Sequence, residues 1–242
     1  MIKQCAVTNI ESRSECDPFD KTGFLPIITA NMYSVVDKHN VSVFLNNNIK
    51  VCMPRGEYMD ESYQYCKDEN YFDSYSLDDF INNFVNTNDG FLNDKAGDLV
   101  KTSVCIDTAA GHLKKLHEAI RKAKEIHGDK LVIMAGNVAS VEAFVELAKT
   151  GADYIRVGIG GCNTTSNTGV GQEDLEFLIK ECDNIRKNPS KYNLIPKSLN
   201  DAQIIVNIQK VKIVADGISS YVKQCESKYG FNDNGYAAIN KL

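Results

Sequence analysis

Strand-like and helix-like segments alternate through the second half of the chain, and this alternation limits the possible folds more than any other feature. Short apolar runs, typical of buried parallel strands, alternate with stretches whose apolar residues recur every three or four positions, typical of helices. Predicted strands cover residues 25–29, 49–53, 103–107, 131–135, 154–158 and 212–215. The clearest predicted helices cover residues 113–126, 140–149 and 173–187, and a further helix is predicted near residues 76–85. Ser76 and Ser140 are the expected N-caps, and residues 188–210 contain an expected polar insertion. Polar residues cluster where the strands end, which predicts a parallel sheet with its chemistry at the carboxyl edge.

We therefore expect an α/β fold, a TIM (β/α)8-type barrel in which only about six βα units are present. Six strands do not close an eight-stranded barrel, and an open edge leaves backbone groups unpaired. The chain is then either a fragment, or the gap is filled by rearrangement or by another subunit. We expect residues 1–242 to form this single incomplete domain, with residues 55–102 as a polar connecting region and a short helix near the end.

The composition is that of a soluble globular protein. Hydrophobic residues make up 43% of the 242 residues, charged residues make up 24%, and the net charge is -5. This acidic balance argues against a nucleic-acid-binding surface. Neither a signal peptide nor a membrane-length apolar run is apparent, so the eight cysteines are expected to be reduced thiols in the cytoplasm. The four histidines lack the spacing of metal ligands, and no metal site is predicted from them.

The segment 154–171, YIRVGIGGCNTTSNTGVG, is the clearest candidate for a ligand-binding loop. An apolar strand leads into Gly158, Gly160 and Gly161, and Cys162 follows directly. Glycines at a strand end let the backbone turn sharply and approach a ligand closely. Cys162 is the strongly nucleophilic side chain of this loop. The alternative is that this lone cysteine is a small buried hydrophobe.

Five segments resemble, in the same order, the IMP dehydrogenase and GMP reductase family. They are residues 12–15 (SRSE), 26–32 (PIITANM), 106–112 (IDTAAGH) with 135–138 (AGNV), 162–171 (CNTTSNTGVG) and 214–217 (VADG). Ordered matches are far more specific than any one motif. The resemblance implies an oxidoreductase that acts at carbon 2 of a purine nucleotide (IMP, XMP or GMP) with NAD or NADP, in a homo-tetramer. The regulatory modules that most IMP dehydrogenases carry do not fit into residues 55–102.

The resemblance also implies roles for individual residues. Cys162 is the nucleophile that adds to purine carbon 2, and Thr164 helps to activate water or ammonia. Asp107 corresponds to an aspartate at the nicotinamide end of the site, where it is both catalytic and cofactor-binding. The implied substrate contacts are Met32 against the base, Asn137 as a polar contact, Asp216 on the ribose hydroxyls, and the backbone of Gly160, Gly161 and Gly217 on the phosphate. A monovalent cation such as K+ is implied at Gly158, Gly160 and Cys162.

Structural roles and other functions are the alternatives. Met32 is otherwise a core gap-filler, Asp107 a helix cap and Asn137 a turn residue. The loop before Cys162 lacks three residues that the family normally has, and one glycine instead of two follows Asp216. These departures leave a non-catalytic relic, for nucleotide binding or subunit pairing, as the main alternative function. A third alternative is a different phosphate-binding barrel with a chance cysteine.

Overall fold

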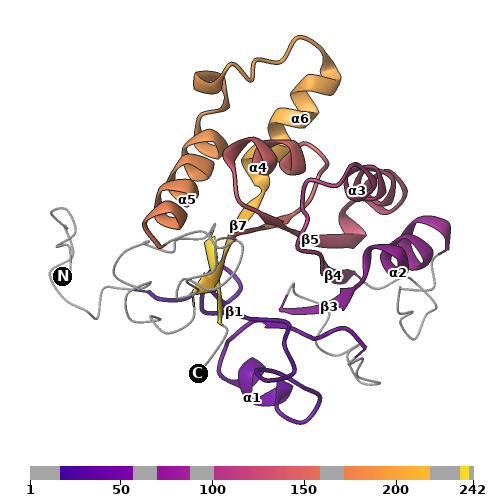
Figure 1. The fold of residues 1–242 in the computed structure, drawn as a ribbon, viewed down its shortest axis with the longest axis vertical. Coiled ribbons are helices and arrows are strands. Elements are labelled where there is room, and N and C mark those ends of the chain that lie inside the picture. Colours follow the sequence, from indigo (N-terminus) through magenta and orange to yellow (C-terminus); the bar gives the residue numbers. More distant parts are fainter. Residues whose placement is uncertain (1–16, 57–69, 88–100, 159–171, 219–234, 240–242) are drawn as a thin grey trace, which may run out of the picture.

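The computed structural model describes residues 17–56, 70–87, 101–158, 172–218 and 235–239 (Figure 1). The strands in these residues are β1 (Ile27–Thr29), β2 (Val51–Cys52), β3 (Tyr71–Tyr75), β4 (Thr102–Ile106), β5 (Leu131–Val138), β6 (Tyr154–Val157), β7 (Lys212–Ile218) and β8 (Gly235–Ile239). They form one eight-stranded sheet in the order β1-β8-β7-β6-β5-β4-β3-β2. All of the strand pairs are parallel.

The two ends of this strand order also meet. The backbone N–H of Thr29 in β1 donates to the carbonyl of Lys50, just before β2, at 3.0 Å, and the N–H of Lys50 donates to the carbonyl of Ile27 at 3.1 Å. The sheet therefore curls round on itself, and the predicted TIM-type barrel is confirmed.

The predicted number of strands was too low by two. β3 lies inside the segment 55–102, which was expected to be a polar connection, and β8 lies where a short helix was expected. β8 pairs with β7 on one side and with β1 on the other, so a strand of the same chain fills the gap that was expected after the strand at 212–215. The physical reason is that Tyr71–Tyr75 contains no β-branched residue and Gly235–Ile239 contains only Ile239, whereas such residues mark the other strands.

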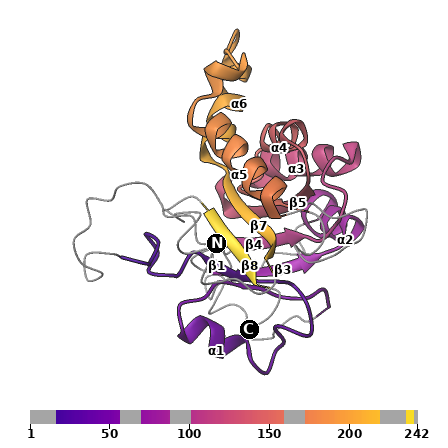
Figure 2. The ribbon, with the colours of Figure 1, turned by 60° about the vertical axis from the view of Figure 1, so that its left-hand side comes forward.

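The helices cover the outside of the sheet (Figures 1 and 2). They are α1 (Val41–Asn46), α2 (Leu77–Ile81), α3 (Lys114–His127), α4 (Val141–Ala148), α5 (Gln172–Lys187) and α6 (Leu199–Lys210), with shorter turns η4 (Asn82–Asn86), η5 (Gly128–Lys130) and η6 (Pro189–Tyr192). The predicted N-caps Ser76 and Ser140 are confirmed, because each side chain accepts a bond from the backbone N–H three residues later. α6 lies in a segment for which no helix was predicted. None of the described helices is long and apolar enough to cross a membrane.

Alternate strand residues divide the core into two parts. In β4, Val104 and Ile106 belong to the cluster beneath the helices, whereas Cys105 belongs to a second cluster with Tyr154 and Val214. This second cluster fills the barrel interior, because successive side chains of a strand point to opposite faces. The residues two positions after Cys105, Tyr154 and Val214 therefore also face inward, at the carboxyl ends of their strands. They are Asp107, Arg156 and Asp216.

Candidate functional site

A polar cluster lies at the carboxyl ends of β4 to β7, and Arg156 is at its centre. The Arg156 guanidinium donates to Oδ2 of Asp216 from Nη2 at 2.6 Å and from Nε at 3.1 Å. Asn137 Nδ2 donates to the same oxygen at 2.6 Å and to the carbonyl of Gly158 at 2.7 Å. Three of these four bonds hold the Asp216 carboxylate to side chains of β5 and β6.

Asp107 extends this cluster toward solvent. Its Oδ1 lies 3.8 Å from Nη1 of Arg156, and its Oδ2 lies 3.0 Å from Nε of Arg55, which follows β2. The Arg156 and Asp216 side chains are each 11% exposed, the Asp107 side chain is 30% exposed, and that of Arg55 is 56% exposed. The cluster is thus more buried at Asp216 than at Asp107, whose carboxylate is the more accessible to a ligand.

Gly158 lets β6 and β7 approach closely beneath the cluster. Its φ is +121°, and a Cβ at this position would lie 2.5 Å from the carbonyl oxygen of Asp216. Real Cβ contacts are essentially never that short. The backbone of Asp216 therefore has its place only because residue 158 has no side chain.

Two buried thiols lie on the inner side of Arg156. Nη1 of Arg156 donates to Sγ of Cys105 at 3.9 Å, and Sγ of Cys52 lies 3.5 Å from the hydroxyl of Ser74. A hydrogen bond from Cys52 lowers the pKa of Cys105, and Arg156 lowers it further against the effect of burial. The same bond and burial raise the pKa of Cys52. In this pair the Cys52 thiol donates the hydrogen bond and the Cys105 sulfur accepts it.

The charge of Arg156 is maintained inside the barrel. Burial alone would lower the pKa of Arg156, but Asp216, with smaller contributions from the two thiols, outweighs burial and raises this pKa. Arg156 is therefore a permanent cation between Asp107 and Asp216.

The structure brings together three of the predicted site residues: Asp107, Asn137 and Asp216. Asp107 does not cap the following helix, because Leu113 is the N-cap of α3. Met32 follows β1 and is 47% exposed, so it does not fill a gap in the core. Gly217 lies in β7, directly after Asp216. The predicted residues Cys162, Thr164, Gly160 and Gly161 lie outside the described residues, and their roles stay predictions.

The sequence analysis missed Arg156 and Arg55. Arg156 lies within an apolar strand, and its alternation with Tyr154 was the available signal, since residues two apart share a strand face. Arg55 follows Pro54 at a strand end, and no pattern around it indicated a partner.

No group of three His, Cys, Asp or Glu side chains that could hold a metal ion occurs among the described residues. Of the residues predicted to hold a monovalent cation, only Gly158 is described. Its carbonyl accepts the bond from Asn137.

A closed parallel barrel with charged side chains at the carboxyl ends of its strands defines the chain as a member of the TIM-barrel class, whose active sites lie at that face. The fold is similar to that of inosine 5'-monophosphate dehydrogenase from Legionella pneumophila, with a TM-score of 0.62 and 19% identity. That likeness covers 98% of this chain and 66% of the other.

The sequence matches the IMP dehydrogenase / GMP reductase domain over residues 85–224, more than half of the chain. The chain belongs to the IMP dehydrogenase / GMP reductase family. It is 33% identical over 178 residues to the GMP reductase of Bacillus subtilis (strain 168), covering 67% of this chain and 51% of that protein. It is 29% identical over 195 residues to the GMP reductase of Mesoplasma florum, covering 74% of this chain and 58% of that protein. The chain thus spans about half the length of these relatives.

Proposed function

We propose that this chain is a purine nucleotide oxidoreductase that acts at purine carbon 2 through a covalent adduct with Cys162. The observation that carries the proposal is the meeting of Asp107, Asn137 and Asp216 in one cluster. These residues come from three separate motifs, on β4, β5 and β7. Their convergence is what a nucleotide site at the carboxyl edge of a barrel requires.

The proposed reaction is the reduction of GMP, because the similar proteins from B. subtilis and M. florum are named GMP reductase. The Cys162 thiolate forms a bond to carbon 2, and the exocyclic amine accepts a proton and leaves as ammonia. Thr164 positions that ammonia. After hydride has added to carbon 2, the carbon–sulfur bond breaks, which releases IMP and restores the thiolate. IMP dehydrogenation uses the same adduct in the oxidative direction.

The nicotinamide cofactor, NAD or NADP, supplies or accepts the hydride when it is bound. The residues present fit such a cofactor, since Asp107 offers a partly exposed carboxylate that accepts hydrogen bonds and a carboxamide has N–H groups to donate. Asp107 would hold the carboxamide end. Arg55 and Arg156 hold the Asp107 carboxylate in place for this contact.

Substrate binding is assigned to Asp216 and Met32. Arg156 and Asn137 both donate to Oδ2 of Asp216, so the carboxylate is already oriented when the ribose hydroxyls arrive. A preoriented carboxylate loses little conformational freedom on binding. The exposed Met32 side chain supplies an apolar contact for the purine base.

Replacement of the nucleophile tests this mechanism. Cys162→Ala should abolish turnover of GMP while GMP affinity changes by less than about threefold, because the thiol acts in the chemical step rather than in binding. Cys182→Ala, which alters a buried thiol of α5, is the matched control and should keep turnover. Steady-state absorbance of the nicotinamide and calorimetric GMP binding are the two measurements. Turnover by Cys162→Ala would rule out the assigned nucleophile.

A non-catalytic relic that binds nucleotides or pairs subunits is the second candidate. The short loop before Cys162 favours it, because a nucleophile displaced by about 1 Å loses on the order of a hundredfold in rate. Thiol labelling of Cys162, located by mass spectrometry with and without GMP, separates the two candidates. Protection by GMP supports a working pocket, and equal labelling supports the relic. A homo-tetramer and a cytoplasmic location stay predictions.

A further inference from the structure

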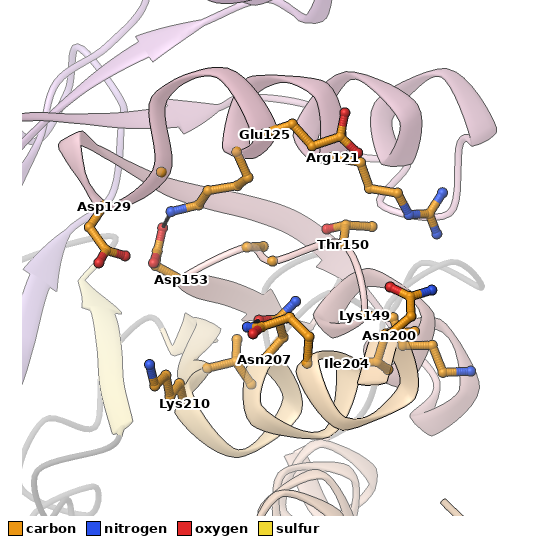
Figure 3. Close-up of a pocket in the computed structure, with 16 residues that line it drawn as sticks. Arg121, Glu125, Asp129, Lys149, Thr150, Asp153, Asn200, Ile204, Asn207 and Lys210 are labelled. Carbon is orange, nitrogen blue, oxygen red and sulfur yellow. Dashed lines mark hydrogen bonds and ion pairs between the residues drawn. The ribbon is translucent and has the colours of Figure 1, made fainter. Parts of the chain in front are cut away.

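A groove of about 570 Å³ lies between α3 and α6 (Figure 3). Its floor is the turn of residues 149–153, and its walls are the two helices. The lining residues Asp129, Asp153 and Val211 lie just before the starts of β5, β6 and β7. The groove therefore belongs to the amino-terminal face and not to the proposed nucleotide site.

The floor of the groove is held by a partly buried ion pair. Lys124 Nζ lies 2.6 Å from Asp153 Oδ2 and also donates to the carbonyl of Leu131 at 2.6 Å. Gly151 lies at the centre of the floor, and a Cβ there would lie 3.4 Å from Lys124 and 3.6 Å from Nδ2 of Asn207. These contacts give the groove a defined base.

Arg121 is the lining cation that has neither an ion pair with the described residues nor a place in the last turn of its helix, and the carboxylates of Glu125 and Asp129 line the same groove. Lys124 pairs with Asp153, Lys149 pairs with Glu146 at 2.6 Å, and Lys210 lies in the last turn of α6, where a cation favours the helix dipole. Arg121 lies before the last turn of α3 and forms no ion pair with the described residues. Figure 3 shows its guanidinium at the same end of the groove as Lys149 and Asn200.

Amide side chains line the α6 wall, at Asn200, Gln203 and Asn207. Nε2 of Gln203 donates to Oδ1 of Asn207 at 3.0 Å. An amide both donates and accepts hydrogen bonds, as a hydroxyl group does, so this wall matches a ligand rich in hydroxyls. The described residues that line the groove include no aromatic side chain, so there is no ring on which a nucleobase would stack.

We propose that this groove binds a small phosphorylated sugar. The phosphate lies against Arg121, because a guanidinium fork matches phosphate oxygens in a bidentate geometry. The sugar hydroxyls bond to Asn200, Gln203 and Asn207. The volume of the groove is within the range of small-molecule sites, roughly 300–1,000 Å³.

Calorimetric titration of the full chain with ribose 5-phosphate, inorganic phosphate and ribose tests the proposal. Ribose 5-phosphate should bind saturably and more tightly than either part alone. Arg121→Ala should weaken its binding about tenfold or more, since a charge-assisted bidentate contact is lost. Lys122→Ala is the matched control, because Lys122 is the exposed next residue of α3 and does not line the groove, and this variant should bind as the parent does.

Gln203→Ala should weaken ribose 5-phosphate binding and leave phosphate binding unchanged. Absence of saturable binding would overturn the proposal, and so would equal affinities for ribose 5-phosphate and phosphate, which would indicate an anion site only. Binding that is lost in Asp216→Asn but kept in Arg121→Ala would place the ligand at the polar cluster and would also overturn it. GMP turnover is measured separately, so absence of ligand binding in the groove can be distinguished from absence of the proposed enzyme activity.

Discussion

Arg156 is the residue on which the polar cluster depends. It contacts Asp216, Asp107 and Cys105, and its side chain is almost fully buried. A charge buried without its partner is costly, so the cation and its carboxylates stabilise the fold only together. The same contacts that orient Asp216 for a ligand are therefore part of the stability of the barrel.

Replacement of Arg156 alone should lower the free energy of unfolding more than replacement of both Arg156 and Asp216. We expect Arg156→Met to lower the free energy of unfolding by about 3–5 kcal/mol, because Asp216 keeps a buried charge without its cation. The double variant Arg156→Met/Asp216→Asn should recover part of this loss, since no unpaired charge remains. Urea unfolding of both single variants and the double variant measures the coupling. Strictly additive losses would show that the two side chains do not interact.

Asp73 of β3 should make the protein less stable as the pH rises. Its Oδ1 is buried without a hydrogen-bond partner, and burial raises the pKa of Asp73 to about 6, although a bond from Tyr71 opposes the shift. The folded state thus binds a proton more tightly than the unfolded state. From about pH 4 to about pH 6 the contribution of Asp73 to stability falls, and above that range the charged carboxylate keeps its full cost.

Asp73→Asn should therefore raise the free energy of unfolding at pH 7 by about 1–3 kcal/mol and reduce its pH dependence between pH 4 and 6. Chemical denaturation at several pH values is the measurement. Asp78→Asn is the control for loss of an exposed carboxylate, since the Asp78 side chain is 77% exposed. An unchanged pH slope in Asp73→Asn would contradict the assignment of this titration to Asp73.

Part of the site was predictable because its residues follow apolar strands. Asp107, Asn137 and Asp216 interrupt such runs at their ends, where the sequence motifs also lie. Arg156 was not predicted, because a single cation inside an apolar strand has the same pattern whether it faces solvent or a buried carboxylate. Only the closed barrel, which turns the position two residues after Tyr154 inward, decides between the two.

At the scale of elements, the contact between the end of β6 and β7 positions the cluster. Gly158 has a φ of +121°, and its missing side chain leaves room for the carbonyl of Asp216. Gly158→Ala should lower the free energy of unfolding by about 2–3 kcal/mol, from backbone strain and from displacement of β7. Gly23→Ala, also at a positive φ but with nothing within 4 Å of the added Cβ, is the control and should cost about 1 kcal/mol. Thermal or urea unfolding measures both variants. Equal losses of stability in Gly158→Ala and Gly23→Ala would contradict the close approach of the Asp216 carbonyl to Gly158.

The predictability of each element depended on its local signals. The helices with serine caps at Ser76 and Ser140 were predicted close to their observed starts. α6 has the same signal, because the Ser198 side chain accepts a bond from the N–H of Asp201, but its surroundings read as a polar insertion. β8 was predicted as a helix, since Gly235–Ile239 contains two alanines and its strand character comes from pairing on both sides.

At the scale of the whole molecule, β8 closes the barrel. Ala237 is in register with Ile27 of β1 and with Ala215 of β7, so this strand joins the first part of the chain to the strand that carries Asp216. Without it, β1 and β7 would each present unpaired backbone groups. The five-residue strand β8 therefore holds β1, from the first part of the chain, beside β7, the strand that carries Asp216.

Ala237→Pro should open this closure. Proline removes a backbone donor and does not fit inside a strand that is paired on both sides, which costs about 3 kcal/mol or more. Ala237→Ser keeps the backbone N–H and is the matched control. We expect the proline variant to melt at least several degrees below the serine variant and, because the seam between β7 and β1 supports Asp216, to bind GMP more weakly. Thermal unfolding followed by circular dichroism and calorimetric GMP titration are the measurements. Equal melting of the two variants would show that the barrel does not depend on β8, and β1 and β7 would then need another partner.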